Sequence, residues 1–316
     1  VFLNGALLIP VTDYAATTNT SVVLSSGAAA SDVLEVVAYD ISSIANAVPT
    51  SGGTFTGPLT VEGNFTADGG TIKLDGNYPV GTDNVALGDT ALDTTTGSYN
   101  TAIGSKALTA NTSGITNSAL GIQALETNTT GSDNTSMGGS SLRYNTTGDS
   151  NTAMGRDALR SNTTASNNTA VGYQAGYANT TGVNLASHGY QSLYSNTTGA
   201  GSAAFGFRAL YTNTTGAYNA ASGTEALYSN TTGSSNVAQG RHALFSNTTA
   251  SYNTAVGYQS MYSNTTAQYN TAIGGAAMQY NTTGGENAAL GVGALNANTS
   301  GSYNTAVGRS ALVANT

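Results

Sequence analysis

From residue 82 onward, apolar and polar positions recur along the chain with a period of seventeen residues. A representative unit is NTAVGYQAGYANTTGVN, residues 168–184. The glycine of its NTAVG segment recurs first after sixteen residues and then every seventeen, at Gly88, Gly104, Gly121, Gly138, Gly155, Gly172, Gly189, Gly206, Gly223, Gly240, Gly257, Gly274, Gly291 and Gly308. Such a period indicates a repeat architecture in which each unit buries its apolar face only against its neighbours.

Two positions of each unit carry its bulky aliphatic side chains. One precedes the repeated glycine: Leu87, Ile103, Leu120, Met137, Met154, Val171, Val256, Ile273, Leu290 and Val307, with Phe205 in one further unit. The other follows it by four residues: Leu92, Leu108, Leu125, Leu142, Leu159, Leu193, Leu210, Leu227, Leu244, Met261, Met278, Leu295 and Leu312. This spacing is too sparse for an amphipathic helix, which needs an apolar residue every three or four positions. It predicts short strands closed by turns.

Side chains of a strand alternate between its two faces. We therefore expect the bulky residue before the glycine to face the interior and the neighbouring alanine to face outward. Coils stacked about 4.8 Å apart would align aliphatic columns inside and an Asn-Thr ladder at the turns. The predicted fold class is all-β: a parallel β-solenoid, or β-roll, of fourteen coils over residues 82–316. Because these columns are thin, we expect three parallel chains packed through their Ala and Gly faces.

The residues before the repeats predict three further segments. Residues 1–40 read as a small β domain with a turn at Asn4-Gly5. Residues 41–52 carry apolar residues at i, i+3 and i+7, which fits either a linker or a short coiled-coil staple. Residues 53–81 are short β-branched runs separated by glycine pairs, which is typical of a linker repeat.

Several of these stretches resemble known families. VFLNGALLIPVTDY, SVVL and DVLEVVAYD together resemble a small β domain in tail-fibre proteins of tailed bacteriophages, marine ones in particular. GGTFTGPLTVEGN looks like the G-x-x-x-T-G-P-L-x-V linker repeat of phage tail fibres, and the NTAVG-type repeats resemble those in predicted tail fibres of marine phages and large algal viruses. NTAVG is also similar to the S-V-A-I-G segment of the left-handed β-roll in trimeric autotransporter adhesin heads, whose coils are shorter. The resemblance implies a homotrimeric fibre.

Composition and charge argue against other classes. Charged residues make up only 8% of the chain, so side chains for acid, base or nucleophilic chemistry are scarce. The net charge of -8 comes from residues 1–93, with ten acidic and one basic residue. Residues 94–316 hold six acidic and seven basic residues and show no basic patch of the kind that binds nucleic acid.

There is no cysteine for a disulfide or thiolate site. No apolar run approaches the ~18 residues of a membrane span, and the start at Val1 predicts a piece of something longer.

An aromatic residue stands five positions after the glycine in six consecutive units. We call this set the aromatic ladder: Tyr177, Tyr194, Tyr211, Tyr228, Phe245 and Tyr262. In-register coils would stack these rings along one side of the shaft. The ladder is interpreted either as a stabilising stripe or as a glycan and host-contact platform.

The position before the glycine turns polar in three units, at His188, Ser222 and Gln239. We interpret these as polar core positions that set the register between chains, as single buried polar residues can. Three copies of His188 near a trimer axis would offer imidazole ligands, but a histidine satisfied by its neighbours is the commoner case. We predict no metal and no cofactor.

A cluster of aspartates lies around the start of the repeats: Asp68, Asp75, Asp83, Asp89 and Asp93. It lacks the compact alternating spacing of a calcium loop, so turn residues are the better interpretation.

An Asn-Thr-Thr or Asn-Thr-Ser turn closes almost every unit. Its asparagines, here called the turn asparagines, are formal N-glycosylation acceptors: Asn111, Asn128, Asn145, Asn162, Asn179, Asn196, Asn213, Asn230, Asn247, Asn264, Asn281 and Asn298. The alternative interpretation is that these asparagines are ordinary turn residues.

The leading functional hypothesis is a structural and adhesive fibre shaft of a virion, a tail fibre that presents many weak host contacts. The alternative is a secreted or cell-surface filament or adhesin of a microbe or alga, glycosylated on its turn asparagines. Expected partners are two further copies of the chain, other fibre or virion proteins and a host surface glycan or protein, with no nucleic acid and no membrane insertion.

We do not expect an enzyme. Glycosidic cleavage needs two carboxylates a few ångströms apart. The repeats supply only Glu126, Asp133, Asp149, Asp157, Glu225 and Glu286, among which Asp149 and Asp157 are the pair worth testing.

Overall fold

The computed structural model of the 316-residue chain describes residues 81–315 throughout and, before them, the backbone of five short strands. The chain divides into two compact units, 1–66 and 67–316, which are described separately. All regular elements among the described residues are β-strands. The all-β prediction is therefore confirmed.

The first unit contains two small antiparallel sheets. β1 (Phe2–Leu3) pairs with β2 (Ala6–Leu7) and with β5 (Leu34–Glu35). β3 (Tyr14–Thr18) pairs with β4 (Ser21–Leu24). The β1–β2 register leaves two residues between the strands, as the predicted turn at Asn4-Gly5 requires. The predicted linkers at 41–52 and 53–81 lie outside the described residues, apart from Gly81.

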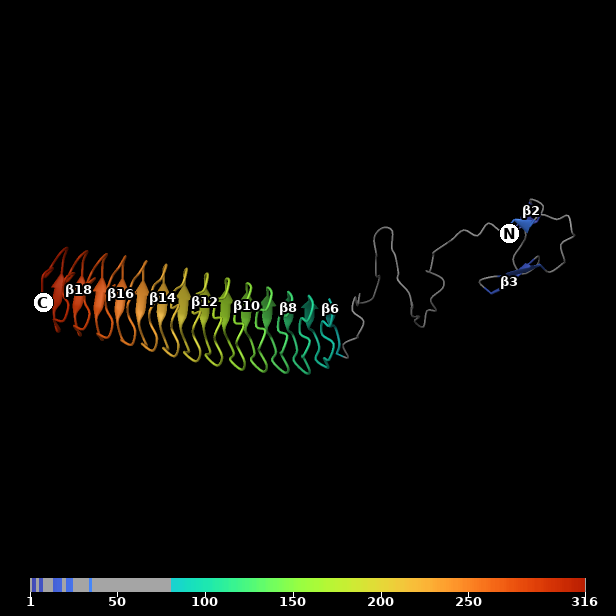
Figure 1. Cartoon of the computed structure of the whole chain (residues 1–316), viewed down its shortest axis with the longest axis horizontal. Helices are drawn as coiled ribbons and strands as arrows, with labels where there is room; N and C mark the ends of the chain where they lie inside the picture. The colour runs from blue at the N-terminus through green and yellow to red at the C-terminus, as the bar shows by residue number, and fades with distance from the viewer. Residues whose placement is uncertain are drawn as a thin grey trace. The chain divides into compact units, whose positions relative to one another are not determined.

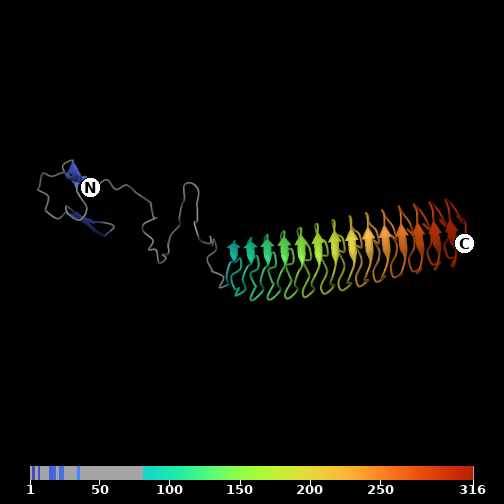
Figure 2. The same cartoon turned by 180° about the vertical axis from the view of Figure 1, so that it is seen from behind.

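The second unit is a β-solenoid with a single parallel sheet of 14 strands, ordered along the chain (Figures 1 and 2). The strands are β6 (Val85–Leu87), β7 (Thr101–Ile103), β8 (Ser118–Leu120), β9 (Thr135–Met137), β10 (Thr152–Met154), β11 (Thr169–Val171), β12 (Ala186–His188), β13 (Ala203–Phe205), β14 (Ala220–Ser222), β15 (Val237–Gln239), β16 (Thr254–Val256), β17 (Thr271–Ile273), β18 (Ala288–Leu290) and β19 (Thr305–Val307). Like residues pair across neighbouring coils, as Ala153 does with Ala170. The predicted repeat fold is confirmed.

Each strand faces the opposite way from our prediction. In β10 the middle residue Ala153 is fully buried, whereas Met154 points outward and is 39% exposed. The same alternation holds in all 14 strands. The strands face this way because the cross-section of each coil is narrow. Side chains from the opposite wall already fill the interior, so only alanine or serine fits beneath the sheet.

The opposite wall is the column of Leu and Met residues four positions after the glycine, whose inward placement is confirmed for all members except Leu312, which is 50% exposed in the last coil. From Leu92 to Leu295 these side chains are 0–1% exposed. The backbone is left-handed at each of them, with φ of 49° at Leu193. A leucine in this region is uncommon and strained, and it persists because burial of the side chain outweighs the strain.

Two asparagine columns complete the interior. The turn asparagines are joined by an amide ladder in which Asn128 Nδ2 donates to Asn111 Oδ1 at 2.9 Å and to the Gly131 carbonyl at 2.8 Å. A second column, the strand asparagines, lies four residues before the repeated glycine in all but two coils; Asn117 Nδ2 donates to the same Gly131 carbonyl at 2.8 Å. Buried amides are stable here because each finds partners within its coil and in the next.

The repeated glycine is required by backbone geometry. At Gly206, φ is +137°, and a Cβ there would lie 2.6 Å from the Gly223 carbonyl oxygen of the following coil. A side chain would therefore separate the coils and break their hydrogen bonds.

The interior is interrupted once. Gly176 takes the place of leucine in its coil, and the apolar core splits there into one cluster that ends at Ala175 and another that begins at Leu185. Leu185 and Ser202 replace the strand asparagine in the next two coils. The coil at 168–184 is thus an atypical member of the array, and the departure lies inside it.

Candidate functional site: the outer columns of the solenoid

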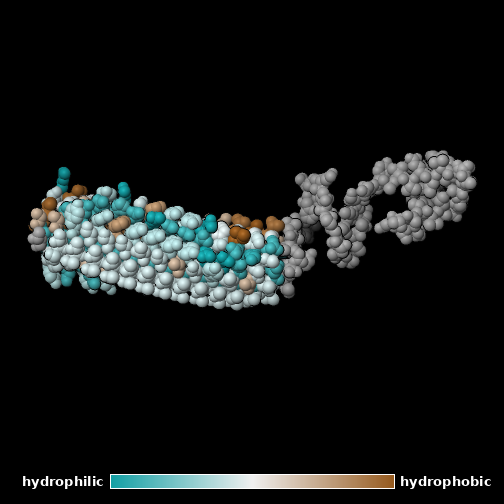
Figure 3. All heavy atoms as spheres, in the orientation of Figure 1, coloured by the Kyte–Doolittle hydropathy of each residue, from teal (hydrophilic) through white to brown (hydrophobic). Residues whose placement is uncertain are grey.

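With the interior nearly uniform, the candidate sites lie on the outside. The residues before the repeated glycine form an outer column on the exposed face of the sheet. Its most exposed large apolar members are Leu87, Leu120, Met137, Met154, Phe205, Ile273, Leu290 and Val307. Each of the 14 strands has two outward-facing residues, and neither of them is Asp, Glu, Lys or Arg in any strand. Figure 3 shows a mostly pale surface on which brown, apolar atoms lie chiefly near the two ends of the solenoid, among teal, hydrophilic ones.

The three polar positions predicted for the core belong to this outer column, so that prediction is wrong. Ser222 and Gln239 are exposed, and His188 is half-buried. The ring of His188 stacks on Phe205 with centroids 5.0 Å apart, and its Nδ1 is buried without a hydrogen-bond partner. They are outside because the strand turns its alanine or serine inward.

A depression of about 300 Å³ opens over β13, β14 and β15. Phe205 and Gln239 border it, and Ser222, the smallest residue of the outer column, lies between them. The depression exists because a large side chain is missing from one coil of an otherwise bulky column.

The aromatic ladder forms as predicted. Its successive rings from Tyr177 to Tyr262 lie 5.1–5.2 Å apart between centroids, with planes within 9° of parallel. Each inner ring thus has both faces covered by neighbouring rings, and Tyr177 is capped by Arg160, whose Nη1 donates to its hydroxyl at 2.7 Å. Burial, and after it the phenols of Tyr177 and Tyr211, raises the pKa of Tyr194 above its ordinary value.

This geometry favours the stabilising interpretation of the ladder. A sugar binds an aromatic side chain through the face of the ring, and the inner rings of the ladder expose only their edges. Its rings are also half-buried. The host-contact role of the ladder has no direct support in this arrangement.

Two sets of aromatic residues that the sequence analysis did not single out are more exposed. The edge tyrosines, five positions before the next repeated glycine, are 55–77% exposed: Tyr99, Tyr218, Tyr252, Tyr269 and Tyr303. Directly after the glycine, Tyr173, Tyr190 and Phe207 stack with centroids 5.3–5.4 Å apart. Their irregular recurrence hid them from a search for consensus, although their column positions were available from the period.

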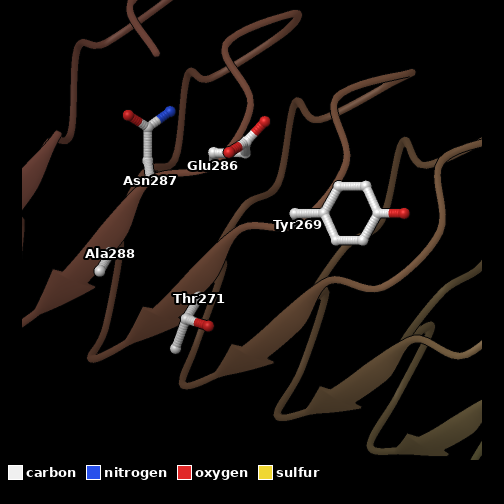
Figure 4. Close-up of a pocket in the computed structure, with 5 residues that line it drawn as sticks. All are labelled: Tyr269, Thr271, Glu286, Asn287 and Ala288. Carbon is white, nitrogen blue, oxygen red and sulfur yellow. The ribbon is translucent and has the colours of Figure 1, made fainter. Parts of the chain in front are cut away.

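One edge tyrosine borders an open groove (Figure 4). Thr271 and Ala288 belong to β17 and β18, while Tyr269, Glu286 and Asn287 come from the segments leading into those strands. Tyr269 stacks on Tyr252 at 5.0 Å with planes 1° apart, so the ring is held in place. The groove thus combines a fixed aromatic ring with a carboxylate and a hydroxyl.

The turn asparagines cannot carry glycans in this fold. Each is 0% exposed, and Asn179 Nδ2, for example, donates to Asn162 Oδ1 and to the Gly182 carbonyl, both at 2.9 Å. A glycan on that nitrogen would replace a hydrogen bond and need space inside the coil. This contradicts the glycosylation candidates and removes the observation that would have favoured a glycosylated filament.

The candidate carboxylates are engaged separately. Asp149 Oδ1 accepts a hydrogen bond from the Ser132 amide at 2.7 Å, whereas Asp157 lies 3.4 and 3.5 Å from Nε of Arg156 and Arg160. Within residues 81–315, no three His, Cys, Asp or Glu side chains gather as a metal site would require. Nor does the described part of the chain contain a helix long and apolar enough to cross a membrane.

Comparison with known proteins gives no assignment. No protein-family model matches the chain, and no curated protein is significantly similar to it. Function is therefore argued from the fold and its outer columns.

Proposed function

We propose that this chain is the shaft of an adhesive virion fibre, which holds host-contacting surfaces away from the particle. The observation that carries the proposal is the unbroken in-register stack of 14 parallel strands. At about 4.8 Å per coil, the stack spans roughly 65 Å. Each coil is bonded to the next through backbone and amide ladders, so the rod resists bending. The resemblance of residues 1–64 to phage tail-fibre segments supports the virion, and a homotrimer remains the proposed assembly.

Contact with a host surface is assigned to the edge tyrosines and the Tyr269 groove rather than to the aromatic ladder. A single shallow groove binds weakly, and several copies on one fibre raise the avidity without any new contact. The ligand class proposed is a surface glycan, because an aromatic ring beside a carboxylate and a hydroxyl suits a pyranose with adjacent hydroxyl groups.

Binding to an array of bacterial and algal surface glycans tests this role. The triple variant Tyr252→Ala, Tyr269→Ala, Tyr303→Ala should lose about tenfold or more in apparent affinity, as expected when repeated weak sites are removed. The matched variant Tyr194→Phe, Tyr211→Phe, Tyr228→Phe keeps the ladder stacked and should bind normally. Undiminished binding by the first variant, or no binding by the wild type to any glycan, contradicts the adhesive role.

The same proposal holds that the protein does not cleave glycans. Incubation with capsular polysaccharides should release no reducing ends. Turnover that disappears in Asp149→Asn or Asp157→Asn would replace the fibre proposal with a depolymerase.

A further inference from the structure

The exposed face of the 14-stranded sheet runs the whole length of the solenoid, and the proposed function assigns it no role. We propose that copies of this chain associate through this face, with the four coils that carry His188, Phe205, Ser222 and Gln239 packed against the same four coils of another copy. This inference rests on the proposed function, since it names the surface on which the fibre assembles.

The chemistry of the face selects its partner. Eight large apolar side chains of the outer column, between Leu87 and Val307, are 39–69% exposed, and Ile103, Val171 and Val256 are half-buried. Contiguous exposed apolar surface of this kind marks an interface. Because no Asp, Glu, Lys or Arg points outward from any of the strands, a charged macromolecule would find no complementary group there.

Dimensions point to a second copy. Three residues per strand span about 10 Å and 14 strands about 65 Å, which gives roughly 650 Å² of projected face per chain. A standard interface buries about 800 Å² of accessible surface per partner. The accessible surface of this face is larger than its projected area, because the side chains project from it. A partner must also present side chains at the same coil spacing along that whole length, and another copy of the solenoid does so.

The polar residues that interrupt the outer column set the register between the two copies. Apolar residues occupy the column up to Val171 and again from Val256 onward. A copy shifted along the rod would bury Gln239 or His188 against aliphatic side chains, with no hydrogen-bond partner. In a parallel copy in the same register each coil meets its own equivalent, so His188 faces His188, Gln239 faces Gln239, and Phe205 packs on Phe205 beside the depression over Ser222.

Mass measurement at micromolar concentration tests the surface. Wild-type protein should sediment as a multiple of 31.5 kDa. Met154→Lys with Ile273→Lys places two charges on the face and should give a monomer of unchanged circular dichroism and melting. The matched control, Thr164→Lys with Thr283→Lys, adds the same charges to the same coils at exposed turn positions and should keep the wild-type mass. A monomeric wild type, or an oligomer that survives the sheet-face lysines, overturns the proposal.

Cross-linking tests the register, since the chain has no cysteine of its own. With a short bismaleimide, Ser222→Cys should link copies efficiently and Thr232→Cys, on the exposed turn of the same coil, should not. Linking through Thr232→Cys alone would falsify the assigned face. Failure here is distinct from failure of the fibre role: an oligomer held by another face can still bind glycans, and a sheet-face oligomer can fail to bind any.

Discussion

The inside and the outside of each coil follow different rules. Inside, nearly every coil repeats the same alanine, leucine and two asparagines, and each position has one stacking partner on either side. Outside, the residue before the glycine ranges from valine to phenylalanine, glutamine and histidine along the same rod. Interior positions are therefore constrained by stacking, whereas outer positions are free to vary and can carry recognition. Paired substitutions, one at an interior position and one at an exposed position, test this contrast.

The largest difference in stability is expected between alanine substitutions at two adjacent glycines. Gly274 has φ of +139°, and a Cβ would meet the Gly291 carbonyl oxygen at 2.5 Å, whereas nothing lies within 4 Å of a Cβ on Gly275. Gly274→Ala should lose more than about 4 kcal/mol of stability, and Gly275→Ala should change it by about 0.5 kcal/mol or less. Denaturant midpoints measure both. Similar midpoints for the two variants would show that stacking does not require the glycine.

Removing one interior amide should be the next largest effect. Asn179 donates to Asn162 and Gly182 and accepts from Asn196, each at 2.9 Å. Asn179→Ala leaves unpaired groups and a small cavity, for an expected loss of about 2–4 kcal/mol. Thr181→Ala, on the exposed side of the same turn, is the control and should be nearly neutral. Equal melting temperatures for the two variants would argue against the ladder as a stabilising element.

The aromatic ladder should contribute less per residue. Tyr211 stacks on Tyr194 and Tyr228, both at 5.2 Å, so Tyr211→Ala removes two ring contacts of about 0.5–1.5 kcal/mol each. Tyr303 is 77% exposed, and Tyr303→Ala should shift stability by only about 0.5 kcal/mol. Thermal unfolding followed by circular dichroism compares them. A larger effect at Tyr303 would mean that the ladder is not the stabilising stripe.

The smallest expected effect is a dependence on alkaline pH. The pKa of Tyr194 is raised, first by burial and then by Tyr177 and Tyr211, so the fold favours the neutral phenol. Its contribution is fully present below the ordinary tyrosine pKa of about 10 and is lost as pH rises through the higher folded-state value. The melting temperature should fall over this range, and less steeply in Tyr194→Phe. An identical fall in the variant assigns the effect to other tyrosines.

Much of the fold followed from spacing. The period gave the solenoid, the parallel register and the inward leucine column, because only stacked coils bring residues seventeen apart into contact. The ladder from Tyr177 to Tyr262 followed from the same rule. The facing of the strands did not, because a three-residue strand with valine, alanine and threonine can bury either side. The edge tyrosines were missed because they occupy their column in only some coils.

The constant repeat length alone dictates that equivalent residues of successive coils stack on one another. Tertiary structure decided which of the stacked residues lie inside. The leucine column and the two asparagine columns fill the coil from the wall opposite the sheet, so Ala153 and its equivalents fit inward and Met154 and its equivalents do not. That choice follows from the volume left in a narrow cross-section, which alternation along one strand does not reveal. It also turned His188, Ser222 and Gln239 from predicted core residues into the surface through which we propose that copies meet.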